Sequence, residues 1–168
     1  MLSFRKNNWL YKVYTWLPVL LLYLSVLNEF DLNYISIEYF SFNFPFLLIF
    51  YFALKAYGRF DFLLFFIAGL INDTVIGLPL GISSFSYILI CIFAAYLRNI
   101  TIRPNVVKDW FYFLFVISLI NSINYSVLFF FFSFELDIMF YIVNNFFTFL
   151  LYMPITYLFD KYLRAIND

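Results

Sequence analysis

Six long apolar runs, separated by short polar links, occupy almost the whole of this chain. The runs cover residues 13–27, 39–54, 61–76, 80–97, 110–132 and 138–159. A helix that crosses a bilayer needs about 20 mainly apolar residues, so six such helices and their links use up the 168 residues. The sequence therefore predicts an all-α integral membrane protein, a bundle of six transmembrane helices that forms a single domain over residues 1–168. A separate soluble domain does not fit.

Composition supports this class of protein. Hydrophobic residues make up 65% of the chain and charged residues 12%, whereas soluble domains have roughly 45–50% apolar and about 25% charged residues. The first run follows Arg5, Lys6 and Lys12 as a signal peptide would, but no small-residue cleavage pattern comes after it. We therefore expect a retained first helix and exclude a soluble enzyme.

The ten lysine and arginine residues lie only in alternate links. Short loops rich in Lys and Arg stay on the cytoplasmic side of the membrane, so this alternation tests the division into helices independently of hydropathy. Both termini are therefore predicted to be cytoplasmic in a multi-pass protein. The basic residues are Arg5, Lys6, Lys12, Lys55, Arg59, Arg98, Arg103, Lys108, Lys161 and Arg164. The opposite side carries Glu29, Asp31, Glu38, Asp73, Glu135 and Asp137.

The residue types present exclude most catalytic chemistry. The chain has no histidine and one cysteine, Cys91, which removes Ser-His and Cys-His nucleophile pairs and histidine-based metal sites. An intramembrane aspartyl protease would need a second deep aspartate beside Asp73. The net charge is zero, so no attraction to nucleic acid is implied. We expect a protein that is not an enzyme and that has no metal or cofactor.

Polar side chains inside the apolar runs are the informative positions, because each one costs free energy in lipid unless it finds a partner. They form one stripe on each of the last two helices, and we expect the two stripes to face each other. The stripes hold either interhelical hydrogen bonds, a solute pocket or a docking face for a partner's helix. The first stripe is Ser118, Asn121, Ser122 and Tyr125, and the second is Tyr141, Asn144, Asn145, Thr148, Tyr152 and Thr156.

Three of the four glycines lie between the third and fourth runs, as Gly69, Gly77 and Gly81, together with Asp73 and Pro79. Pro79 makes one continuous helix unfavourable. We expect the third helix to end near Gly77 and Pro79 to begin the fourth. Gly77→Val should then be more damaging than Gly69→Ala, because a left-handed helix end does not tolerate a β-branched residue.

The position of Asp73 has three interpretations. Residues 60–76 reach about 26 Å as a helix, which barely spans a hydrocarbon core of about 30 Å. Asp73 should therefore sit at or just inside the outer surface. It is either a ligand for a proton or cation, a fixed polar contact that holds the helix junction, or a solvated loop carboxylate.

This segment resembles the rod shape-determining protein family MreD of bacteria. The resemblance rests on the order glycine, aspartate, glycine, Pro-Leu-Gly at a break between two membrane helices, here Gly69, Asp73, Gly77, Pro79 and Gly81. The motif covers about 13 residues, and chain length, the basic segment before the first helix and the lack of a soluble domain are similar too. Asn72 departs from the apolar residue expected beside the aspartate.

The resemblance implies a non-enzymatic scaffold in the inner membrane, part of the cell-elongation machinery that positions peptidoglycan synthesis. It implies binding to MreC, a single-span protein, and action with the actin-like MreB, the glycosyltransferase RodA and its partner transpeptidase. That family is similar in fold to the substrate-binding subunits of energy-coupling-factor transporters. A vitamin-binding transporter subunit that uses the two polar stripes as its pocket is therefore the alternative hypothesis.

Overall fold

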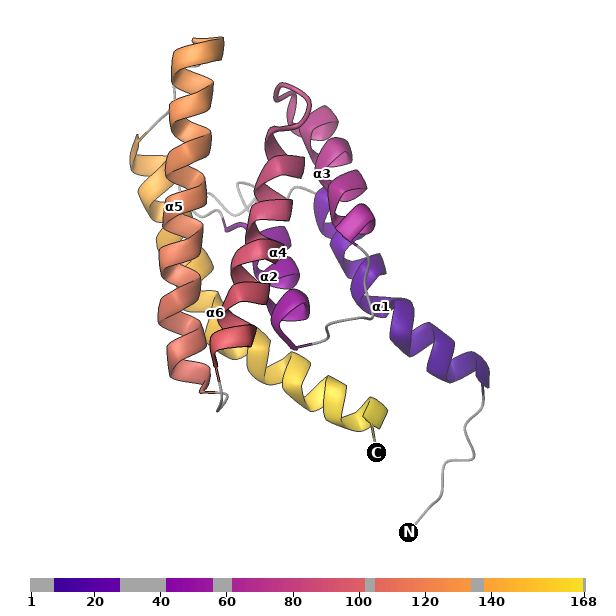
Figure 1. The fold of residues 1–168 in the computed structure, drawn as a ribbon. Helices are drawn as coiled ribbons and strands as arrows, with labels where there is room; N and C mark the ends of the chain where they lie inside the picture. Colours follow the sequence, from indigo (N-terminus) through magenta and orange to yellow (C-terminus); the bar gives the residue numbers. More distant parts are fainter. Residues whose placement is uncertain (1–7, 28–41, 56–61, 102–104, 134–137, 168) are drawn as a thin grey trace, which may run out of the picture.

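The computed structural model describes residues 8–27, 42–55, 62–101, 105–133 and 138–167, with side chains from Trp16 to Lys161. The described residues form six helices and no strand (Figure 1). This confirms the prediction of an all-α fold with six helices. The helices are α1 (Asn8–Leu27), α2 (Phe44–Lys55), α3 (Phe62–Ile76), α4 (Ile82–Ile100), α5 (Val106–Phe132) and α6 (Ile138–Asn167).

Three of these helices are long and apolar enough to cross a membrane over the part of the chain that the structure describes. They are Ile82–Ile100, Val106–Phe132 and Ile138–Lys161. The described apolar stretches of the other three helices are shorter, namely Trp16–Leu27, Phe44–Lys55 and Phe62–Ile76. The protein therefore has the composition and helix lengths of a membrane protein, and its helices differ markedly in length.

Several helix ends differ from the predicted ones. The second helix begins at Phe44 rather than at residue 39: residues 42 and 43 are not helical, and 39–41 lie outside the described part. Asn43 sets this start, because its side-chain oxygen accepts the amide hydrogen of Phe46 at 3.2 Å as an N-cap. The fifth helix begins at Val106, where Asn105 plays the same role. The sixth continues past residue 159 to Asn167.

The short helix α2 lies at the centre of the bundle. Figure 1 shows α5 and α6 on one side, α1 and α3 on the other, and α2 and α4 between them. Phe50 of α2 packs its ring against Phe113 of α5 at 5.0 Å and against Tyr152 of α6 at 5.9 Å. An apolar helix without a polar face is suited to such a position. Its buried residues are Pro45, Phe46, Leu47, Leu48, Ile49, Phe50, Tyr51, Phe52 and Leu54.

Large apolar side chains cover the outside of the bundle. In water such a surface would be unusual for a monomer, but lipid accepts it. The outward apolar residues of α5 and α6 include Phe111, Phe115, Phe129, Phe130, Ile142, Phe146 and Leu150. Those of α1 and α3 include Trp16, Leu20, Leu24, Phe62, Leu63, Phe66 and Ile67.

Candidate functional site

The corner between α3 and α4 begins with a left-handed glycine. α3 ends at Ile76, and Gly77 follows with φ +75°. The amide hydrogen of Leu78 bonds back to the carbonyl oxygen of Asp73 at 2.9 Å, which is the longer hydrogen bond of a Schellman helix end. The predicted end of the third helix near Gly77 is thus confirmed.

The start of the next helix was predicted wrongly. α4 begins at Ile82, not at Pro79, and Gly81 is its N-cap residue with φ +105°. A backbone in that region cannot continue an α-helix toward its N-terminus, so Pro79 stays in the turn, where its carbonyl oxygen accepts the amide hydrogen of Ile82 at 3.4 Å.

Asp73 supplies the cap that Gly81 cannot provide. One carboxylate oxygen, Oδ2, accepts the amide hydrogen of Gly81 at 2.7 Å, and the other, Oδ1, accepts that of Ser83 at 2.9 Å. Asp73 is completely buried. A carboxylate at a helix N-terminus is stabilised by the unpaired amides and by the helix dipole. This geometry agrees with a fixed contact at the helix junction, and the interpretation as a solvated loop carboxylate is wrong.

Further contacts hold α3 and α4 at close range. The side-chain amide of Asn72 donates to Ser83 Oγ at 2.9 Å, and Ser84 Oγ donates to the carbonyl oxygen of Phe66 at 2.9 Å. A Cβ atom added at Gly69 would lie 2.4 Å from the Cα atom of Ser84, which no packing tolerates. Gly77 has open space around it. Glycine is therefore required at position 69 because α4 packs against it, and at position 77 because the backbone there is left-handed.

The two polar stripes face each other, as their spacing predicts. The amide of Asn121 on α5 donates to Asn145 Oδ1 on α6 at 2.7 Å. One helical turn away, the Tyr141 hydroxyl lies 3.0 Å from Ser122 Oγ and donates to the carbonyl oxygen of Ser118 at 3.1 Å. The ring of Tyr125 lies edge-on to that of Tyr141, 6.0 Å between centroids. These pairs are the hydrogen bonds expected between helices in lipid.

The C-terminal part of the second stripe, Thr148 and Tyr152, contacts other parts of the bundle. Thr148 is buried and accepts the amide hydrogen of Asn43, at the start of α2, at 2.8 Å. Its own hydroxyl donates to the carbonyl oxygen of Asn144 at 2.7 Å. Tyr152 stacks on Phe113 at 4.7 Å within the aromatic core. Thr148 therefore ties α6 to the start of α2, and Tyr152 extends the contact of α6 with α5 by ring stacking.

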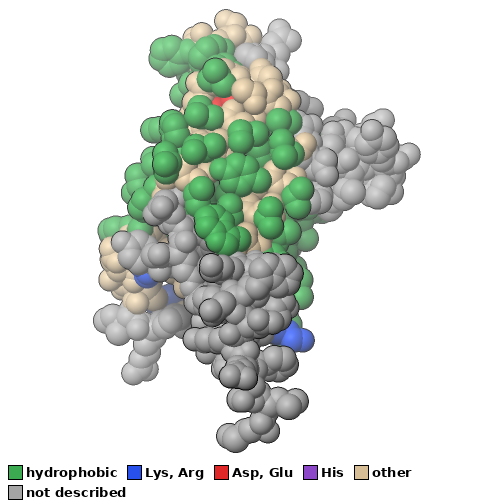
Figure 2. Space-filling view, turned by 90° about the vertical axis from the view of Figure 1, so that its right-hand side faces the viewer, with side chains coloured by type: hydrophobic (Ala, Val, Ile, Leu, Met, Phe, Trp, Pro, Cys, Tyr) green, Lys and Arg blue, Asp and Glu red, His purple; other side chains and the backbone are tan. Residues whose placement is uncertain are grey.

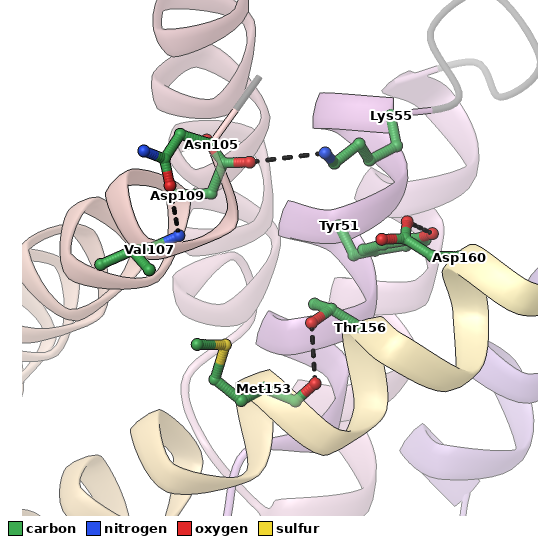
Figure 3. Close-up of polar contacts among 8 residues, drawn as sticks. All are labelled: Tyr51, Lys55, Asn105, Val107, Asp109, Met153, Thr156 and Asp160. Carbon is green, nitrogen blue, oxygen red and sulfur yellow. Dashed lines mark hydrogen bonds and ion pairs between the residues drawn. The ribbon is translucent and has the colours of Figure 1, made fainter. Parts of the chain in front are cut away.

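Sequence reasoning missed a cluster of polar contacts around the C-terminal end of α2 (Figure 3). Lys55 forms an ion pair with Asp109 of α5, with 3.5 Å between Nζ and Oδ2, and Asp109 is 3% exposed. The Tyr51 hydroxyl donates to Asp160 of α6 at 2.7 Å. Arg98 of α4 donates to the carbonyl oxygen of Ala53 at 3.0 Å. We call these contacts the α2-end cluster.

Local spacing gave no signal for the α2-end cluster, because its partners are 45 to 109 residues apart in sequence. The same holds for Ser86 of α4, which donates to Asn124 Oδ1 of α5 at 2.9 Å. In the described residues, no buried side-chain nitrogen or oxygen lacks a hydrogen-bond partner, and no group of three or more Cys, Asp or Glu side chains is placed to hold a metal ion. Most of the polar side chains named above thus join two helices.

Comparison with protein-family models, curated proteins and solved structures gave no match to this chain.

Proposed function

We propose that this protein is a non-enzymatic scaffold of the bacterial cell-elongation complex, with an MreD-like role in placing peptidoglycan synthesis. The observation that carries the proposal is the α3–α4 corner. The motif residues Gly69, Asp73, Gly77 and Gly81 serve one structural purpose there, a helix junction fixed by close contact, two left-handed glycines and a buried carboxylate. A rigid junction of this kind is suited to presenting a fixed helix surface to a partner.

The polar contacts support a scaffold over a solute-binding protein. The Asn121 and Asn145 amides bond to each other, and the Ser122 and Tyr141 hydroxyls lie within hydrogen-bonding distance. Groups that already have partners inside the bundle are less available to orient a solute, since a buried site gains its selectivity from unpaired polar groups. Outward apolar helix faces then remain the main interface, and in lipid they bind other helices through close packing.

The proposal includes six membrane spans, with both termini in the cytoplasm of a bacterium. Contacts at the α2-end cluster bring the C-terminal ends of α2 and α4 beside the start of α5 and the C-terminal part of α6. Each of these four segments is adjacent to lysine or arginine residues, so their meeting at one end supports a single cytoplasmic side. In Figure 1 the first turn of α1 and the last turn of α6 also lie toward that end.

The decisive experiment is depletion of the protein in the bacterium that encodes it, with imaging of cell shape and of fluorescent wall-precursor incorporation. Rounded cells with delocalised wall synthesis are expected. Complementation with Asp73→Asn and Asp73→Leu adds a matched pair of variants. Asparagine keeps one side-chain acceptor oxygen at position 73, whereas leucine keeps none. Unchanged cell shape, together with a growth defect that a vitamin rescues, would contradict the scaffold role and favour the transporter subunit.

A second experiment tests the partner directly. The tagged protein, solubilised in mild detergent from cells that make both proteins, should co-purify with an MreC-like single-span protein. RodA, its transpeptidase and MreB are expected in the same complex at lower recovery, since they belong to the machinery without being the proposed direct contact. Absence of the single-span protein from the purified sample, with the bait folded and abundant, would count against the proposal.

A further inference from the structure

The helices fall into a short group and a long group when their apolar lengths are compared. In α1 the apolar stretch between Lys12 and Asn28 covers residues 13–27, and in α3 the stretch between Asp61 and the corner at Gly77 covers residues 62–76. Each reaches about 22 Å along the helix axis. Both are shorter than a typical hydrocarbon core of about 30 Å.

The other side of the bundle is longer. In α5 the apolar stretch after Asp109 covers residues 110–132, and in α6 the stretch between Asp137 and Asp160 covers residues 138–159. The stretch in α5 reaches about 34 Å. α6 contains Pro154 and bends along its length in Figure 1, so α5 sets the length of this side. The average tilt of a membrane helix, about 20°, would shorten the α5 stretch only to about 32 Å. Tilt therefore does not remove the difference of about 10 Å between the two sides.

The outer boundary of the short side is fixed by the α3–α4 corner. Irregular backbone that faces lipid is not found within the hydrocarbon layer, because its amide and carbonyl groups have no solvent there. Gly77 is exposed and Leu80 is 71% exposed in this corner. The corner must therefore lie at or beyond the headgroups. At its other end α3 begins at Phe62, directly after the acidic residue Asp61 of the sequence, and a charged side chain is costly within the hydrocarbon layer.

The short side has an outward apolar surface. α1 and α3 are in contact, and the Tyr23 hydroxyl donates to the carbonyl oxygen of Leu64 at 3.3 Å. Leu20 and Leu24 of α1 are 59% and 55% exposed, and Leu63 of α3 is 65% exposed. Figure 2 views the molecule from this side, and the described side chains of its upper part are mostly apolar, with Lys and Arg only toward the lower end. We call this surface the α1–α3 face.

We propose that the α1–α3 face binds lipids with short acyl chains, so that the bilayer beside this face is locally thinner. The face formed by α5 and α6 matches a bilayer of ordinary thickness. A bilayer deforms to match a short apolar surface at a cost that rises with each ångström of mismatch, and shorter acyl chains lower that cost. The proposal rests on insertion of the bundle in a membrane and is independent of the elongation role. Its failure would leave the scaffold proposal untouched.

The test compares lipid preference on the two faces of the full-length protein in vesicles. The three native tryptophans are replaced by phenylalanine, and one reporter is added, either Phe66→Trp on α3 or Phe115→Trp on α5. Both positions are outward, at 41% and 56% exposure. Quenching by brominated phosphatidylcholines with acyl chains of about 14 to about 22 carbons gives the relative binding of each lipid at each face.

The α3 reporter should favour the shortest chains over the longest by about threefold, while the α5 reporter should bind best to chains of intermediate length. The same optimum at both reporters would overturn the proposal. So would an α3 reporter that no lipid quenches, because a second copy of the chain would then cover that face. Leu63→Trp serves as a second α3 reporter if Phe66→Trp does not give a single folded species in detergent.

Discussion

The carboxylate of Asp73 caps α4 from the neighbouring helix, with Oδ2 2.7 Å from the amide nitrogen of Gly81. The other oxygen, Oδ1, accepts the amide hydrogen of Ser83 at 2.9 Å, the bond that the N-cap residue Gly81 cannot make because it has no side chain. A buried acid thus performs the task that Ser, Asp or Asn usually performs at the N-cap position. Its burial is tolerated because its oxygens accept backbone hydrogen bonds at the positive end of a helix.

Removing the acceptors at Asp73 should destabilise the corner in steps. Asp73→Asn keeps one acceptor oxygen and should lower the free energy of unfolding by about 1 kcal/mol. Asp73→Leu leaves the amides of the half-buried Gly81 and the buried Ser83 unpaired and should cost about 3 kcal/mol. Thermal unfolding in detergent, followed by size-exclusion chromatography, measures both effects.

Thr74→Val is the control for these variants, since Thr74 is exposed and bonds only within its own helix, to the carbonyl oxygen of Ile71. It should behave like the wild type. Equal losses for Asp73→Asn and Asp73→Leu would contradict the capping role and favour proton binding, because a proton site fails whenever the titratable group is removed.

Gly69→Ala should be at least as damaging as Gly77→Val, contrary to the order expected from sequence. The added methyl group at Gly69 meets the backbone of Ser84, which cannot move without displacing α4, so a loss of about 2 kcal/mol is expected. Gly77→Asn should be tolerated, because Asn adopts the left-handed conformation with little strain. Yields of folded protein rank the three variants, and a wild-type yield for Gly69→Ala would contradict the close approach of α3 and α4.

The sequence predictions that the structure confirms are those that a lipid environment imposes on a chain. Lipid requires continuous apolar helices, so the apolar runs located all six helices. It also penalises unpaired polar groups, so the polar stripes of the last two helices were expected to face each other, as the Asn121–Asn145 hydrogen bond shows that they do. The start of α4 was misplaced because Pro79 is a common first helical residue, and the sequence did not reveal that Asp73 would reach across to fix the helix at Gly81. Contacts between distant segments, such as Lys55 with Asp109, depend on how the helices pack.

The Lys55–Asp109 ion pair should show a measurable coupling energy. Lys55→Met leaves the carboxylate of Asp109 buried without its partner, so it should be more destabilising than Asp109→Asn, and the double variant should recover part of the loss. A double-mutant cycle on thermal unfolding should give a coupling of about 1 kcal/mol or more. Lys108→Met is the control, because Lys108 is the exposed neighbour of Asp109. Additive losses would show that the pair contributes nothing beyond its separate residues.

The Asn121–Asn145 pair separates the two functional hypotheses. As a hydrogen bond between helices it is worth about 0.6 kcal/mol, so Asn121→Leu should be mildly destabilising and Asn121→Leu with Asn145→Leu should regain stability, because no amide is then left unpaired. The double variant should still support rod shape in depleted cells. Ser126→Ala is the control, since Ser126 bonds only to the Ser122 carbonyl oxygen of its own helix.

If a vitamin instead raises the melting temperature of the wild type, and the Asn121→Leu, Asn145→Leu double variant loses that shift and its function, the amides act as solute ligands. A ligand that binds only the folded protein stabilises it in proportion to its affinity.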